Sequence, residues 1–205
     1  IKEMNDEGFY TYTGTRQDWS GSRAIFENGQ AMFLITSTAD LGIIREAAAE
    51  SGMDFTTGRL PIPDGSERNG VIIGGASLWV SRDHPQEELA AAVDFALYMT
   101  DTENMVDWST LTGYYPVRNS SVDVLEEEGY FEQFPENTVA FRQLLDTQVN
   151  SATAGALMGT FEDTRIIIEE AIQRVLGGGE VDRALSEAKA QADARLQEYN
   201  ANFPD

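Results

Sequence analysis

The sequence predicts an α/β chain from which part of a sheet is missing. Three short apolar segments have the length and composition of buried strands, namely residues 31–36, 71–73 and 77–80. Longer segments with apolar residues at helical spacing outnumber them, above all residues 160–176 and 181–199. Few strands beside many helices favour the α/β class, with too few strands here for a complete sheet.

Length and composition indicate a folded chain with restricted chemistry. The 205 residues correspond to one to one and a half domains, and 41% hydrophobic residues are enough for a packed core. No apolar run reaches about 18 residues, the length that a membrane-spanning helix needs. The chain has no cysteine and its one histidine is His84, which excludes disulfides, thiol catalysis and the usual zinc sites. We therefore expect no metal and no cofactor.

The chain is strongly acidic, with 35 acidic and 14 basic residues and a net charge of −21. Such a charge repels a phosphate backbone, so we expect no nucleic-acid partner. The only lysines are Lys2 and Lys189, and every other base is arginine. Because salt near 1 M reduces the Debye length to about 3 Å, this self-repulsion is tolerable in brine. We interpret the composition as halophilic; an ordinary acidic protein is the alternative.

Glycine and proline bound the helices expected in the first half. Residues 24–26 read as the tail of a short helix that ends at Gly29, and residues 39–50 as a helix that ends at Gly52. Pro85 suits the first turn of a further helix, because its missing N–H has no partner there anyway.

The second half is expected to be mostly helical. Thr100 and Glu103 have the spacing of a capping box for a helix that ends at Gly113. Short helices are expected around residues 121–128 and 137–146, before the two long ones. The expected apolar stripe of the last helix consists of Val181, Leu185, Ala188, Ala192, Leu196 and Tyr199.

Several segments resemble extracellular solute-binding proteins of family 1, the receptors that feed ABC importers. FENGQAMFLITS (residues 26–37), GRLPIPDG (residues 58–65) and the closing residues 175–196 are each similar to family segments. The stretch from GGASLWV at residues 74–80 to TGYYP at residues 112–116 resembles the glycerol-3-phosphate-binding branch more closely. The resemblance covers nearly the whole chain.

The resemblance implies a periplasmic-binding-protein-like fold of type II, with two α/β lobes around a hinged cleft. Residues 1–66 and 118–205 would belong to the C-terminal lobe, and residues 67–117 to the N-terminal lobe, most of which would be absent. The chain starts at Ile1 and not at methionine, so either a leader has been removed or it is a piece of a longer chain. The resemblance favours a piece and implies that it is the C-terminal half. An exposed apolar surface is then expected under residues 71–115, unless something else covers it.

Arg165 is the first candidate ligand-binding residue. It follows the start of the helix at Thr160, where backbone N–H groups and a guanidinium together suit an anion. A guanidinium can hold a phosphate through two parallel hydrogen bonds. From residue type alone, a surface salt bridge to Glu162 or Glu169 is the alternative, and the resemblance favours the phosphate role.

Two further candidates carry hydroxyl groups. Tyr114 lies in the TGYYP turn; the resemblance places it against the ligand in preference to Tyr115, and packing on Trp108 is the structural alternative. Ser37 follows a predicted strand and could bond ligand oxygens, with Thr38 as the alternative register and a turn cap as the structural explanation.

The last two candidates lie in the GGASLWV segment. Gly75 would offer a backbone N–H with no side chain in the way, or would form a plain β-bulge. Trp79, like Trp19, could stack on a sugar or glycerol chain, although a place in the core is expected more readily for both. His84 reads as a residue that leads into the helix after Pro85.

These observations predict a receptor and not an enzyme. It would bind glycerol-3-phosphate or a glycerophosphodiester outside the membrane by lobe closure and deliver it to the transmembrane subunits of an ABC permease. Contact with the membrane would come only through the permease or an anchor in the missing N-terminal part. A sugar or oligosaccharide receptor of the same fold is the alternative; a glycosidase and a structural surface protein are further classes.

Overall fold

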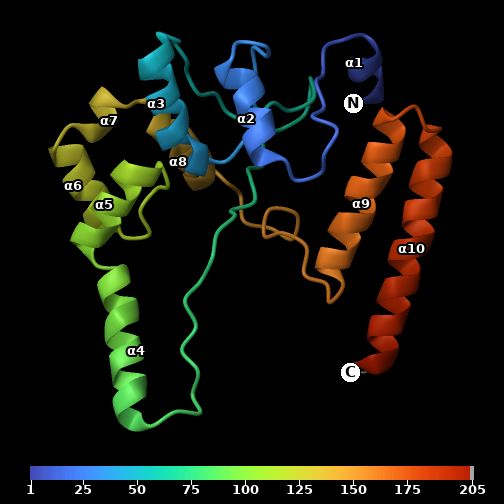
Figure 1. Ribbon diagram of the computed structural model, residues 1–205. Coiled ribbons are helices and arrows are strands. Elements are labelled where there is room, and N and C mark those ends of the chain that lie inside the picture. Colours follow the sequence, from blue (N-terminus) through green and yellow to red (C-terminus); the bar gives the residue numbers. More distant parts are fainter. Residues whose placement is uncertain (204–205) are drawn as a thin grey trace. The chain divides into compact units, whose positions relative to one another are not determined.

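The chain forms two compact units in a computed structural model, which describes residues 1–203 (Figure 1). The first unit joins residues 1–34 to the segment that begins at Gly155, and the second comprises residues 35–154. The first unit contains α1 (Lys2–Asp6), α2 (Trp19–Glu27), α9 (Phe161–Leu176) and α10 (Val181–Asn202). The second contains the 3-10 helix η1 (Thr38–Asp40), α3 (Leu41–Ser51), α4 (Gln86–Met99), α5 (Thr102–Thr112), α6 (Asn119–Glu127), α7 (Tyr130–Gln133) and α8 (Glu136–Leu145).

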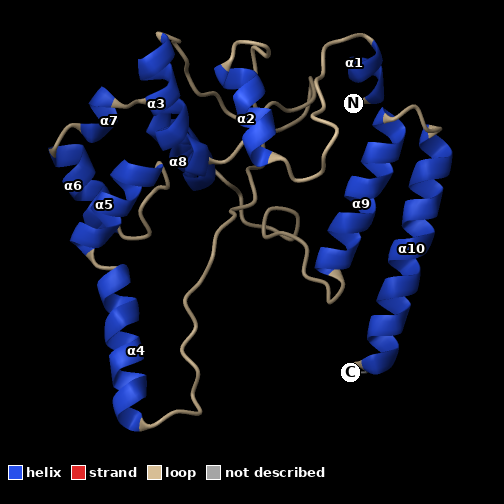
Figure 2. Cartoon of the chain, viewed as in Figure 1, coloured by secondary structure: helices blue, strands red, loops and turns tan. Residues whose placement is uncertain are grey.

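The expected strands do not form, so the α/β class is not confirmed in the described residues. Residues 31–36, 71–73 and 77–80 are without regular structure, and Figure 2 draws the whole connection between α3 and α4 as loop. A strand needs a second extended segment to complete its backbone hydrogen bonds. No segment within residues 1–203 pairs with these three in that way.

The first unit is organised by α9 and α10, which pack side by side (Figure 1). Ile167 and Ala171 of α9 meet Ala188 and Ala192 of α10 in a small apolar cluster. The stripe expected on α10 is partly wrong, because Leu185 is exposed and Ala184 is buried in its place. The buried side chains of α10 are alanines, which are small enough to allow α9 and α10 to approach closely.

Glycine ends the helices of the second unit as expected. Gly52 and Gly113 follow α3 and α5 in the left-handed conformation, which residues with a Cβ adopt with difficulty. The predicted capping box is wrong by one residue. Asp101, and not Thr100, caps α5, with its carboxylate accepting from the Asn104 N–H at 2.8 Å. The Thr100 hydroxyl donates instead to the Ala96 carbonyl of the preceding helix.

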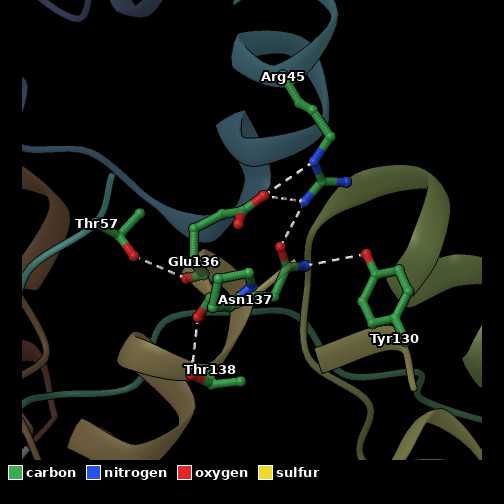
Figure 3. Close-up of polar contacts among 7 residues, drawn as sticks. Arg45, Thr57, Tyr130, Glu136, Asn137 and Thr138 are labelled. Atoms are coloured by element: carbon green, nitrogen blue, oxygen red, sulfur yellow. Dashed lines mark hydrogen bonds and ion pairs between the residues drawn. The ribbon is translucent and has the colours of Figure 1, made fainter. Parts of the chain in front are cut away.

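A polar network ties α3 to α7 and α8 in the second unit (Figure 3). Arg45 donates to Glu136 at 2.9 and 3.1 Å and to the Asn137 amide oxygen at 2.5 Å. Asn137 in turn donates to the Tyr130 hydroxyl at 3.2 Å, and Thr57 donates to the Glu136 carbonyl at 2.9 Å. The network therefore holds the middle of α3, whose start carries one of the candidate site segments.

The segment from residue 71 to residue 111 carries the exposed apolar surface that the sequence predicted. Trp79 is 91% exposed, so the expectation that it packs in a core is wrong in this chain, and the same holds for the exposed Trp19. The other exposed apolar residues of this segment are Ile72, Ile73, Leu78, Val80, Val93, Phe95, Leu97, Tyr98, Trp108 and Leu111.

Candidate ligand-binding site

Arg165 lies in the second turn of α9 with only weak interactions of its own. Its Nη1 is 3.7 Å from the Glu162 carboxylate, and its guanidinium carbon is 5.9 Å from the centre of the Phe161 ring. The side chain is 51% exposed, and an exposed ion pair of this kind contributes under about 1 kcal/mol. The salt bridge expected as the alternative is present, to Glu162. Because it is weak, most of the guanidinium donors stay available to an anion.

The start of α9 contains two buried hydroxyls that bond nothing in the part of the chain that is described. Thr160 is 6% exposed, and neither its Oγ1 nor that of Thr164, one turn later, has a hydrogen-bond partner there. Thr160 occupies the capping position without a side-chain capping bond. The first turn also holds Glu162 and Asp163, so any anion bound near Arg165 meets two carboxylates.

In the second unit, the start of α3 and the end of α5 touch through glycines. A Cβ on Gly113 would lie 2.6 Å from the Thr38 carbonyl oxygen, and a Cβ on Gly42 would lie 2.8 Å from the Leu111 carbonyl oxygen. Neither distance is possible without a shift of backbone. The two candidate segments, with Ser37 before Thr38 and Tyr114 after Gly113, are therefore neighbours in space.

The structure distinguishes the two tyrosines of the TGYYP turn. The Tyr114 ring stacks on Trp108 with centroids 6.4 Å apart, the arrangement expected as the structural alternative, and the residue is 39% exposed. The Tyr115 ring packs against Phe141 at 5.9 Å, and burial raises the pKa of its phenol above the ordinary value. Tyr114 is thus the tyrosine with a face open to solvent.

Ser37 caps η1, as its structural explanation predicts. Its hydroxyl accepts from the Ala39 N–H at 3.3 Å. The neighbouring Thr36 hydroxyl donates to Asp40, which is buried. Ser37 itself is exposed, so its hydroxyl has capacity for a further partner.

Gly75 and Trp79 lie in the unpaired segment before α4. Since no strand forms there, Gly75 is not in a β-bulge, and a Cβ at this position would meet no described atom within 4 Å. Both residues are in the second unit, with Ser37 and Tyr114, whereas Arg165 is in the first. His84 leads into α4 as expected and pairs with Glu88 at 3.2 Å.

A hollow of about 580 Å³ lies between α9 and the strap of residues 14–17. Arg16 pairs with Glu170 at 3.0 Å, Gln17 donates to Glu169 at 3.1 Å, and Gln173 donates to the Gly14 carbonyl at 3.3 Å. These groups bond one another across the hollow, and these contacts are enough to explain why polar side chains lie there.

Neither a metal site nor a membrane span is found in the described residues. No three histidine, aspartate or glutamate side chains within residues 1–203 gather closely enough to hold a metal ion. No helix of that part of the chain is long and apolar enough to cross a membrane.

Comparison with known proteins decides the family. The profile of the family described as "Bacterial extracellular solute-binding protein" matches residues 1–138. The chain belongs to this family. Membership implies a periplasmic-binding-protein-like fold and places the chain on the extracellular side of the membrane, as the sequence predicted.

Individual solute-binding proteins resemble the chain along nearly its whole length. It is 29% identical over 202 residues to the sn-glycerol-3-phosphate-binding periplasmic protein UgpB of Escherichia coli K12. It is 30% identical over 203 residues to the protein of the same name from Yersinia pseudotuberculosis. Each alignment covers 97% of this chain but 45% of the relative, so the chain spans less than half the length of the curated relatives it matches.

Sequence reasoning found candidate residues on both segments but missed Gly42 and Thr112. The Thr112 hydroxyl accepts from the Tyr114 N–H at 3.2 Å and donates to the Trp108 carbonyl at 2.6 Å. A signal for Gly42 was present, because a glycine inside a helical pattern costs about 1 kcal/mol and calls for a packing reason.

Proposed function

We propose that this chain is the C-terminal half of a longer protein, which captures glycerol-3-phosphate or a glycerophosphodiester for an ABC importer. The observation that carries this proposal is the match of 97% of the chain to proteins named for binding sn-glycerol-3-phosphate. Lobe closure around the ligand and delivery to the permease belong to the proposal. The proposed role is that of a receptor, without a catalytic step.

The proposed ligand residues are Arg165, Tyr114, Ser37, Gly75 and Trp79. Arg165 would neutralise the phosphate, and its half exposure and its weak pairing to Glu162 support that role. The open face of Tyr114 and the exposed Ser37 support contacts to hydroxyl or ester oxygens. The backbone of Gly75 would donate an N–H where no side chain intervenes.

The charge of −21 makes anion capture physically demanding. At long range the acidic surface repels a phosphate, and salt near 1 M screens that repulsion beyond about 3 Å. A bidentate contact to Arg165 acts at shorter range and in a site that excludes water, so it is screened less. We propose that high salt permits the ligand to approach and that Arg165 then holds it.

We also propose that residues 67–117 belong to the N-terminal lobe and the rest to the C-terminal lobe. The exposed apolar side chains between residues 71 and 111 support this, because soluble proteins rarely leave a large continuous apolar surface open. The 45% coverage of the relatives is consistent with a second set of elements that lies outside this chain.

A sugar or oligosaccharide receptor is the second candidate. The observation in its favour is Trp79, whose exposed indole could stack on a sugar ring. In that case Arg165 would have no charge to neutralise.

Calorimetric titration of the whole protein in molar salt tests the proposal. Glycerol-3-phosphate, a glycerophosphodiester and a maltose-type sugar are added to separate samples. We expect saturable binding of a phosphate ligand and none of the sugar. Binding of the sugar alone would overturn the phosphate proposal and leave the receptor family intact, whereas binding of none of the three would reject both candidate ligand classes.

A further inference from the structure

The start of α3 and the end of α5 approach so closely that only glycine fits where their backbones meet. Ser37 lies just before the first of these segments, and Tyr114 lies just after the second. Gly42 lies in the first turn of α3, although alanine is the better helix former. A Cβ there would lie 2.8 Å from the Leu111 carbonyl oxygen and 3.5 Å from the Thr112 carbonyl oxygen. Both atoms are backbone, so the clash is relieved only if α5 and α3 move apart.

The same contact continues at the end of α5. Gly113 has φ of +89°, and a Cβ there would lie 2.6 Å from the Thr38 carbonyl oxygen and 2.7 Å from Cβ of Leu41. The chain after α5 thus lies against the chain before α3. The position of Tyr114 relative to Ser37 and Thr38 depends on how closely the two helices approach.

A hydroxyl also holds the Tyr114 backbone. Thr112 Oγ1 accepts from the Tyr114 N–H at 3.2 Å and donates to the Trp108 carbonyl at 2.6 Å. Trp108 also provides the ring on which Tyr114 stacks, with an interplanar angle of 24°. The backbone and the ring of Tyr114 are therefore both held by the last turn of α5, and Gly42 sets where that turn lies.

We infer that Gly42 and Thr112 are positioning residues that determine affinity for the glycerol portion of the ligand through Tyr114. This inference rests on the proposed function, in which Tyr114 contacts the ligand. Neither residue needs to touch the ligand. Their effect should pass through Tyr114 and leave intact the affinity for an anion held by Arg165, which lies in the other unit.

A double-mutant cycle in the whole protein tests the inference. Calorimetry in molar salt compares the wild type, Gly42→Ala, Tyr114→Ala and the double variant, with sn-glycerol-3-phosphate and with inorganic phosphate as separate probes. We expect Gly42→Ala to weaken glycerol-3-phosphate binding at least tenfold in the wild-type background and less than twofold in the Tyr114→Ala background. Inorganic phosphate affinity should change less than twofold.

Two further variants separate positioning from general destabilisation. Gly58→Ala is the matched control, because a Cβ there meets no described atom within 4 Å, and it should leave both affinities unchanged. Thr112→Val keeps the side-chain shape and removes the hydroxyl. If Gly42→Ala does not fold, this variant is used for the test in its place. We expect it to lose three- to tenfold in affinity for glycerol-3-phosphate alone.

The outcomes are distinct. If a folded Gly42→Ala or Thr112→Val protein has a lower melting temperature but wild-type affinity, the residues are merely structural and the inference is overturned. Equal losses in the presence and absence of the Tyr114 side chain also overturn it. If the wild type binds neither glycerol-3-phosphate nor a glycerophosphodiester, the proposed function fails and the inference fails with it; if it binds only the diester, the cycle is measured with that ligand.

Discussion

Among single residues, Thr160 shows how an unused polar group influences stability. Its Oγ1 is buried at the start of α9 and bonds nothing in the described chain, whereas the buried Ser121 hydroxyl donates to the Thr102 carbonyl at 3.0 Å. A buried hydroxyl without a partner has lost its hydrogen bonds to water and gains none from the protein, which lowers the stability of the fold.

Thr160→Val should therefore leave the free energy of unfolding unchanged or raise it by up to about 1 kcal/mol, because the desolvation cost disappears while the shape is kept. Ser121→Ala should lower it by about 1–2 kcal/mol, because a buried bond is lost. Urea unfolding of the two variants measures both. A larger loss for Thr160→Val than for Ser121→Ala would show that the Thr160 hydroxyl has a partner in solution.

Tyr115 gives a pH dependence at alkaline pH. Burial raises the pKa of its phenol above the ordinary 10.0, so between the two values the unfolded chain loses the proton first. The contribution of neutral Tyr115 is complete below the ordinary pKa and is lost as pH rises through the folded pKa. Tyr115→Phe should reduce the decline in unfolding free energy between pH 9 and pH 11 (roughly one unit either side of the ordinary tyrosine pKa). Urea unfolding of the two proteins across this pH range measures the decline. An identical decline in both proteins would contradict the prediction.

At the scale of elements, the sequence predicts helices well because their limits are local. The left-handed glycines after α3 and α5 and the proline before α4 each act within one turn. Strands depend on partners far along the chain, and the candidates at residues 31–36 and 71–80 find none in the described structure. The contact of Gly42 with Leu111 is equally remote, so the glycine within the helical pattern indicates a close approach but does not identify its partner.

The start of α5 gives a test of one local misassignment. The capping carboxylate is that of Asp101, and Glu103 makes no capping bond in the described structure. Asp101→Ala should lower the free energy of unfolding by about 0.5–2 kcal/mol, whereas Glu103→Ala should change it by less than about 0.5 kcal/mol. Thermal or urea unfolding of the two variants measures these changes. A larger effect of Glu103→Ala would support the capping box that the sequence predicted.

For the whole molecule, charge is the dominant property. A net charge of −21 favours expansion, because repulsion among 35 acidic groups is relieved on unfolding. We expect the melting temperature to rise steadily as KCl increases from 0.1 to 2 M, over which the Debye length falls from about 10 Å to under 3 Å. A melting temperature that stays constant or falls over this range would contradict the halophilic interpretation.

Arg165 is the residue proposed to hold the anionic ligand, and a pair of matched variants tests that role. Arg165 and Arg174 lie on the same helix, and the ion pair of each is long, at 3.7 and 3.9 Å. Calorimetric titration of the whole protein with sn-glycerol-3-phosphate in molar salt compares Arg165→Ala with Arg174→Ala. We expect a loss of about 2–5 kcal/mol in binding free energy for Arg165→Ala and wild-type binding for Arg174→Ala. Equal affinities in the two variants would contradict that role.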